Sequence, residues 1–208
     1  MHAVLAGLLD LVAPRRCAAC DRVTDLEKAV FCRACDASIE DYHGVGAVFE
    51  YGGPAADAIR RFKYEGRSDL GRTLGSRMAD EAGVWAGRVD AVIPVPLHWR
   101  RRRSRGYDQA ALLARPVARA LRVPSLFRCL RRARNTPSQA DLPRAERLRN
   151  VRGAFQSRPL AGSPHILLVD DVRTTGATLC AATDALRAAG AGEVHTLVLA
   201  VRLLGGAT

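Results

Sequence analysis

Short apolar runs alternate along the chain with segments in which apolar residues recur every three or four positions. The runs predict buried strands at Val45–Tyr51, Val89–Val95, His165–Val169 and Glu193–Val201. The segments with helical spacing are Ala55–Phe62, Leu70–Ala82, Gln109–Leu121 and Ala177–Ala189. This alternation favours an α/β fold with an open, mostly parallel sheet that helices cover on both faces. Ligands in such sheets bind at the carboxyl ends of the strands.

The most informative stretch is Ile166–Leu179, which reads ILLVDDVRTTGATL. Its apolar run stops at Asp170 and Asp171, and a loop of threonines with Gly176 then leads into a helix. A helix N-terminus carries unpaired N–H groups and about half a positive charge, so it favours a phosphate. The two carboxylates would repel a phosphate and suit sugar hydroxyls or Mg²⁺. The stretch predicts a ligand with a phosphate beside a diol or metal; the alternative is a strand that ends in acids and a polar turn.

A second strand, loop and helix follow each other in the middle of the chain. The loop carries Arg100–Arg103 and Arg105, turns at Gly106 and leads into the helix at Gln109–Leu121. The same argument predicts a second anion site here, occupied by a pyrophosphate. An arginine-rich surface loop and a nucleic-acid contact are the alternatives. Lys63, where a helix gives way to a glycine turn, is either a further anion contact or a solvated surface lysine.

Four of the six cysteines form two CxxC pairs separated by eleven residues: Cys17, Cys20, Cys32 and Cys35. Two such pairs indicate a tetrahedral zinc site with four thiolates. A thioredoxin-type redox centre would need a single pair at a helix start in a βαβ unit, and disulfides do not persist in a reducing cytoplasm. Because no coordination position stays open, we expect the zinc to be structural.

Length and composition fit a soluble globular protein. The 208 residues can form one medium domain and a small appendage, with 48% hydrophobic and 25% charged residues. We expect a module of residues 1–43, with a short helix at Met1–Val12 and the four cysteines, and a domain of residues 44–208. Met1–Val12 lacks the features of a signal peptide, and no apolar run is long enough to span a membrane, so we expect a cytoplasmic protein.

The positive charge is concentrated in one region. The whole chain carries +11, whereas the region Arg100–Arg152 has 16 arginines against Asp108, Asp141 and Glu146, a net +13. Within it, a short strand is predicted at Leu126–Leu130. The polar segment Arg131–Arg152 that follows is predicted to be a mobile lid ordered by a pyrophosphate, or else a loop that stays disordered. Arginines also bind nucleic-acid backbones, although few aromatic residues lie nearby for base stacking.

These motifs resemble known ones. ILLVDDVRTTGATL is similar to the phosphoribosyl pyrophosphate motif of type I phosphoribosyltransferases. The chain as a whole resembles the ComF family, amidophosphoribosyltransferase-like proteins linked to natural competence and DNA uptake. The segments that carry this resemblance are the double CxxC motif, FKYEGR, VIPVPL, RGYDQAALLA, TPSQADL and RAERLRNVRGAF, in this order. Asp108 departs from the asparagine usual in the family and places an acid beside the predicted pyrophosphate site.

The resemblance implies a type I phosphoribosyltransferase-like sheet flanked by helices, with a small N-terminal zinc module. It implies that Asp170 and Asp171 face the ribose hydroxyls and that the Thr/Gly loop holds the 5′-phosphate, with Mg²⁺ on the ligand. Lys63, Asp170 and Asp171 would be the catalytic residues. The substrate-binding residues would be Lys63, Arg105, Gly106, Asp170, Asp171, Arg173, Thr174, Thr175, Gly176, Ala177 and Thr178.

Two classes of function remain open at this point. In the first, the protein is a phosphoribosyltransferase that displaces pyrophosphate from C1 of the ribose with a nitrogen nucleophile, which the sequence does not identify. In the second, the protein keeps the fold without catalysis and handles single-stranded DNA or binds competence proteins. The acid pair and the hydroxyl-rich loop favour the first class.

Overall fold

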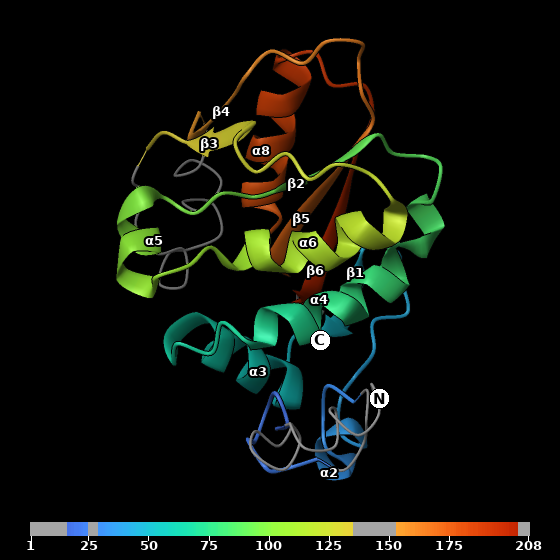
Figure 1. Ribbon diagram of the computed structural model, residues 1–208, viewed down its shortest axis with the longest axis vertical. Coiled ribbons are helices and arrows are strands. Elements are labelled where there is room, and N and C mark those ends of the chain that lie inside the picture. Colours follow the sequence, from blue (N-terminus) through green and yellow to red (C-terminus); the bar gives the residue numbers. More distant parts are fainter. Residues whose placement is uncertain (1–15, 25–28, 135–152, 204–208) are drawn as a thin grey trace, which may run out of the picture.

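A four-stranded parallel sheet in the order β1-β6-β5-β2 forms the centre of the protein (Figure 1). Its strands are β1 (Ala47–Glu50), β2 (Ala91–Pro94), β5 (Ile166–Arg173) and β6 (Val194–Val201). The computed structural model describes residues 16–24, 29–134 and 153–203. The helix predicted at Met1–Val12 and residues 135–152 of the predicted lid lie outside these ranges.

The central strand β5 is longer than its apolar run. β5 pairs with β6 from Ile166↔Val194 to Arg173↔Val201. Asp170 and Asp171 therefore lie inside β5, whereas the sequence predicted that the strand ends before them. The backbone pairing with β6 explains the difference, because a strand continues as long as its neighbour supplies hydrogen-bonding partners.

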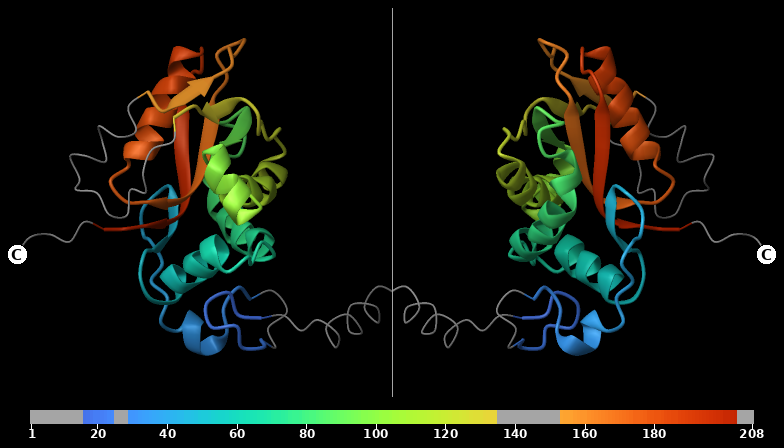
Figure 2. Two further views of the ribbon diagram at one scale, coloured as in Figure 1. Left: turned by 90° about the vertical axis from the view of Figure 1, so that its left-hand side faces the viewer. Right: turned by 90° about the vertical axis from the view of Figure 1, so that its right-hand side faces the viewer.

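Helices cover both faces of the sheet, as predicted (Figure 2). Leu167 and Val169 of β5 point to the face covered by α3 (Gly53–Tyr64), α4 (Leu70–Glu81) and α6 (Gln109–Leu121). The alternate residues Ile166 and Leu168 point to the opposite face, covered by α8 (Ala177–Ala188). All four β5 side chains are fully buried, which explains why this strand reads as a continuous apolar run.

Two glycines let α4 and α6 pack closely. A Cβ atom on Gly71 would lie 2.6 Å from the Cβ of Leu112, and one on Gly75 would lie 2.9 Å from the Cγ of Pro116. Glycine weakens an isolated helix by about 1 kcal/mol relative to alanine. Here the absence of a side chain at these two positions allows α6 to lie against α4, with the single turn η1 (Ala82–Trp85) extending α4 beside it.

Two regions differ from the predicted elements. The arginine-rich segment after β2 forms a short helix, α5 (Trp99–Arg105), where a loop was expected. The short strand predicted at Leu126–Leu130 is instead β3 (Leu130–Arg132), which pairs antiparallel with β4 (Phe155–Ser157). These strands have three residues each and pair across more than twenty residues of chain, so neither has a periodicity that the sequence could show.

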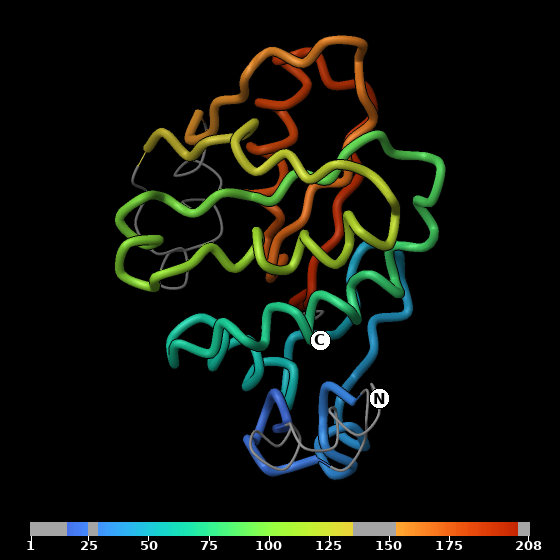
Figure 3. The backbone as a smooth tube through the Cα atoms, in the orientation of Figure 1, coloured from blue at the N-terminus to red at the C-terminus, as the bar shows by residue number. Residues whose placement is uncertain are grey.

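The four-cysteine module lies at one end of the molecule, beside α3 (Figure 3). Its described part contains two short loops and α2 (Arg33–Asp36). Phe31 packs edge-to-face against Phe49 of β1, with ring centroids 5.7 Å apart, so the module joins the core on the α3 side of the sheet. Across the described ranges, no helix has both the length and the apolar character needed to cross a bilayer.

Candidate functional site

A cavity of about 750 Å³ opens where the carboxyl ends of the parallel strands meet. Tyr51 follows β1, Pro96 follows β2, Asp170 belongs to β5 and Arg202 follows β6, so every strand of the sheet contributes to the cavity wall. The remaining walls come mainly from α3, α5 and the start of α8. The lining contains nine of the eleven residues predicted to bind substrate: Lys63, Arg105, Asp170, Asp171, Arg173, Thr174, Gly176, Ala177 and Thr178.

Lys63 and Asp171 form an ion pair within this cavity. The Nζ atom of Lys63, in the last turn of α3, lies 2.7 Å from Oδ1 of Asp171. The two side chains are 19% and 12% exposed. Burial opposes the charge of Lys63, but the attraction of Asp171 outweighs it, and the pKa of Lys63 is raised. In the protein without ligand, Lys63 therefore neutralises one of the acids.

Asp170 behaves differently from its neighbour. Burial, reinforced by the charge of Asp171, raises the pKa of Asp170 to about 8, although the backbone N–H of Asp171 donates a hydrogen bond to Oδ1 of Asp170 at 2.8 Å. Near neutral pH Asp170 is therefore largely protonated, whereas Asp171 forms the ion pair with Lys63. A ligand that interacts with two carboxylates, such as a diol with a cation, would displace that proton.

The loop between β5 and α8 has the geometry of an anion cradle. Gly176 precedes the first residue of α8 in a left-handed conformation with φ of +76°, and no atom lies within 4 Å of where its Cβ would be. Gly176 is the N-cap of α8 and has no side chain, so the cap position itself puts no polar group between the helix N-terminus and the loop. Thr174 and Thr178 line the cavity. Thr175 is outside the lining, and its Oγ1 accepts a hydrogen bond from the backbone N–H of Ala177 at 3.4 Å.

Six arginines also line the cavity. Arg105 and Arg173 were predicted, and the structure adds Arg60, Arg101, Arg132 and Arg202. Burial, together with the like charge of Arg105, lowers the pKa of Arg101. Guanidinium groups that crowd together in this way favour an anionic ligand. Arg101 was visible in the sequence only as one member of an arginine run, and the positions of the other three depend on tertiary contacts.

Asp108 occupies the N-terminus of α6, where the sequence predicts a second anion site. Asp108 caps this helix: its Oδ1 accepts a hydrogen bond from Ala111 N at 3.2 Å, and its Oδ2 accepts one from Leu97 N at 3.1 Å. Gly106 ends α5 with φ of +82° and is not in the cavity lining. The acid at position 108 therefore occupies the helix terminus that would have held an anion, and it fixes the loop after β2.

The four cysteines of the CxxC pairs come together as predicted. Their four Sγ atoms all lie within 4.8 Å of one another, and the Sγ atoms of Cys20 and Cys32 are 3.6 Å apart. A disulfide would require about 2 Å. Zn–S bonds of about 2.3 Å in a tetrahedron place the sulfurs about 3.8 Å apart. The cluster therefore fits a metal ion such as zinc, held by sulfur ligands alone.

Arg61 connects the cysteine cluster with the cavity. Its side chain is 11% exposed; its Nη2 lies 2.9 Å from Oδ1 of Asp21, and its Nη1 donates a hydrogen bond to the carbonyl of Cys17 at 3.4 Å. Nε of the same guanidinium donates to Glu65 at 3.1 Å. Since Lys63 follows two residues later on the same helix, the cysteine loop and the ion pair of the cavity are fixed to one rigid element.

Comparison with known proteins finds a matching family model and several similar proteins. The family model "Phosphoribosyl transferase domain" matches residues 108–205. Competence protein F of Haemophilus influenzae is 35% identical over 156 residues, covering 71% of this chain and 68% of that protein. DNA utilization protein YhgH of Escherichia coli K12 is 28% identical and covers 88% of each chain. Among solved structures, a glutamine phosphoribosylpyrophosphate amidotransferase from B. subtilis aligns with a TM-score of 0.46 and 26% identity, over 67% of this chain and 30% of that one.

The matching relative, the domain model and the four clustered cysteines agree with the order of motifs along the chain. The chain belongs to the ComF family and contains a phosphoribosyltransferase domain.

Proposed function

We propose that the protein binds phosphoribosyl pyrophosphate with Mg²⁺ in the cavity at the carboxyl ends of the strands. The observation that carries this proposal is the meeting of three features in one cavity: the carboxylates of Asp170 and Asp171, the N-terminus of α8 and the six lining arginines. Each feature matches one part of this ligand, namely the ribose diol, the 5′-phosphate and the pyrophosphate.

The ligand would lie across the cavity in a fixed direction. The 5′-phosphate binds the loop at Gly176, where backbone N–H groups and the hydroxyls of Thr174 and Thr178 can donate. The ribose hydroxyls then reach Asp170 and Asp171. The pyrophosphate points toward Arg101 and Arg105, because their positive charges complement an anion and not the uncharged ribose diol.

Mg²⁺ fits the acid pair as a group that arrives with the ligand. Two carboxylates provide hard oxygen donors, but they are too few to hold the ion alone, and Mg²⁺ commonly uses phosphate oxygens for its remaining positions. When bound, it neutralises charge on the pyrophosphate.

We further propose that the protein transfers the phosphoribosyl group to a nitrogen acceptor. The bond between C1 and the pyrophosphate oxygen breaks, the pyrophosphate leaves with the electron pair, and the nitrogen forms a bond to C1 and loses a proton. Such a reaction needs positioning and charge neutralisation more than a dedicated base. Lys63 would contribute by moving between Asp171 and the leaving pyrophosphate, because it is the cation already held at the acid pair.

Pyrophosphate release tests the transfer. Wild-type protein is incubated with phosphoribosyl pyrophosphate, Mg²⁺ and each of a set of nitrogen acceptors: ammonia, nucleobases and amines. Acceptor-dependent release that is lost in Asp170→Asn, and kept in Arg88→Ala, supports catalysis. Arg88 is an exposed matched control, because it precedes β2 at the opposite end of the strand from the cavity.

A second candidate function is the handling of single-stranded DNA without catalysis. The protein would act in the reducing cytoplasm, where a zinc site made of thiolates is stable. The names of the relatives, which refer to competence and DNA utilization, favour this candidate. Under this candidate the phosphoribosyl pyrophosphate site would regulate the protein, and no acceptor would release pyrophosphate.

A further inference from the structure

Two neutral groups hold the side chain of Arg105 at the wall of the proposed phosphoribosyl pyrophosphate cavity. Its Nη1 donates a hydrogen bond to Oε1 of Gln109 at 3.0 Å. Its guanidinium carbon lies 5.0 Å from the centre of the Tyr64 ring, within the range of a cation–π contact. Arg105 and Tyr64 line the cavity, whereas Gln109 does not and is only 1% exposed. Any effect of Gln109 on a ligand therefore has to pass through a neighbour, and Arg105 is the neighbour that it binds.

The turn between α5 and α6 brings these groups together. Arg105 is the last residue of α5, and Gly106 follows with φ of +82°, so the chain can turn back into α6. The hydroxyl of Tyr107 donates a hydrogen bond to the carbonyl of Phe62 in α3, and the centroids of the two rings lie 5.8 Å apart. This contact fixes the last turn of α3, which carries Tyr64, beside the end of α5.

Neither partner neutralises the charge of Arg105. In the parts of the chain that the structure describes, no carboxylate forms an ion pair with this side chain. A guanidinium has five N–H donors, and the hydrogen bond to Gln109 uses one of them, so the others can bind an anion. A carboxylate partner would instead compete with that anion for the arginine. An amide and an aromatic ring therefore orient the side chain and leave its charge available.

We propose that Gln109 and Tyr64 are positioning residues, which hold Arg105 in place for the pyrophosphate of the ligand. An arginine side chain that is already ordered loses less conformational entropy when it binds, so the ligand binds more tightly. The effect is confined to the pyrophosphate end, because the 5′-phosphate is assigned to the loop at Gly176. This inference rests on the proposed function and adds two residues to it.

Calorimetry with two ligands tests this role. Phosphoribosyl pyrophosphate and ribose 5-phosphate, each with Mg²⁺, differ at C1, where only the first carries a pyrophosphate. Gln109→Met keeps the length of the side chain without the acceptor; it should weaken phosphoribosyl pyrophosphate about 3- to 10-fold and leave ribose 5-phosphate unchanged. Tyr64→Leu should show the same selective loss, of about threefold, whereas Tyr64→Phe keeps the ring and should bind both ligands like wild type. A distorted cavity would weaken both ligands instead.

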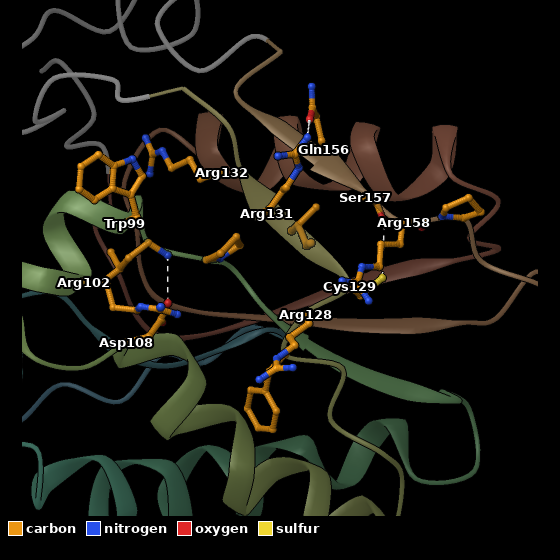
Figure 4. Close-up of a pocket in the computed structure, with 15 residues that line it drawn as sticks. Trp99, Arg102, Asp108, Arg128, Cys129, Arg131, Arg132, Gln156, Ser157 and Arg158 are labelled. Atoms are coloured by element: carbon orange, nitrogen blue, oxygen red, sulfur yellow. Dashed lines mark hydrogen bonds between the residues drawn. The ribbon is translucent and has the colours of Figure 1, made fainter.

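A second glutamine–arginine pair provides a matched control. Gln156 accepts a hydrogen bond from Arg131 at a second cavity, of about 870 Å³, and Figure 4 shows this contact. Neither residue lines the phosphoribosyl pyrophosphate cavity, so Gln156→Met should leave both affinities unchanged. A double-mutant cycle then tests the route through the arginine: in an Arg105→Ala background, Gln109→Met should have no further effect on the affinity for phosphoribosyl pyrophosphate.

The outcomes separate this inference from the proposed function. If wild type binds phosphoribosyl pyrophosphate and Gln109→Met binds it equally tightly, or loses both ligands to the same extent, the positioning role is wrong and the proposed function stands. Additive losses in Arg105→Ala/Gln109→Met would also overturn the positioning role. Tyr64 is 70% exposed, so its two variants give the answer even if Gln109→Met is unstable. A wild type that binds no phosphoribosyl pyrophosphate would overturn the proposed function, and the positioning role with it.

Discussion

Replacing Lys63 with methionine should show how much the positive charge beside Asp170 and Asp171 contributes to the stability of the folded protein. Methionine has a similar length and helix propensity, so Lys63→Met removes the charge with little effect on α3 itself. It leaves Asp171, which is 9% exposed, next to Asp170 without the ammonium group now 2.7 Å from its Oδ1. Both carboxylates then lie in a partly buried site without their main counter-charge.

The magnitude follows from burial and protonation. Removing one partner of a buried ion pair costs about 3–5 kcal/mol. The pair is not fully buried, with 19% and 12% exposure, and it borders an open cavity, so we expect about 2–3 kcal/mol at pH 8. At lower pH one of the two acids can take up a proton instead of staying charged without a partner. Each pH unit of decrease lowers the free energy of that protonation by about 1.4 kcal/mol. The loss should therefore be smaller at pH 6.

Urea unfolding of four proteins measures this effect: wild type, Lys63→Met, Asp171→Asn and the double variant, each at pH 8 and pH 6. The double variant has no uncompensated charge at the pair and should recover most of the stability lost in Lys63→Met. The reasoning is refuted if Lys63→Met loses less than about 0.5 kcal/mol at pH 8, or if the double variant is no more stable than the single one.

Three further predictions follow from the same contacts. Purified protein should contain one zinc ion per chain by elemental analysis, and Cys17→Ser/Cys20→Ser should lose it and aggregate; full metal content in that variant would contradict the zinc assignment. Arg61→Leu, which removes the contacts to Asp21 and the Cys17 carbonyl, should lower the free energy of unfolding by about 1–3 kcal/mol and accelerate zinc loss to a chelator, whereas Arg60→Leu on the exposed side of α3 should do neither. The pKa of Asp170 is about 8 in the folded protein and near 4 in the unfolded chain, so between these values the folded state binds an extra proton. The contribution of Asp170 to the free energy of unfolding should therefore fall as the pH rises from 4 to 8. Asp170→Asn should remove this pH dependence from the free energy of unfolding measured in urea.

Much of the fold could be predicted from local pattern. The helix Gln109–Leu121 has the predicted bounds because its apolar spacing, the cap Asp108 and the left-handed Arg122 all act within the segment itself. The same holds for the loop at Gly176, where strand, hydroxyl-rich turn and helix follow each other directly. Asp170 and Asp171 could be predicted for the same reason, because they directly follow the apolar run of β5 in the sequence.

The missed features depend on contacts between distant segments. The sequence left Lys63 as either an anion contact or a surface lysine, and only the approach of α3 to β5 gives it Asp171 as a partner. Arg132 reaches the cavity because β3 pairs with β4, and no periodicity marks either strand. Asp108 was read as an acid beside an anion; the fold turns its carboxylate to the helix N–H groups instead.

The most direct test of the central claim is calorimetry with phosphoribosyl pyrophosphate and Mg²⁺ on wild type and on Asp170→Asn/Asp171→Asn. Wild type should bind at a single site, and the double variant should bind more weakly by about 1–3 kcal/mol, because the ribose hydroxyls lose charged acceptors. Circular dichroism should show that the double variant keeps its fold, since the sheet pairing of β5 uses the backbone. Equal affinity in the two folded proteins would contradict the account and place the ligand elsewhere.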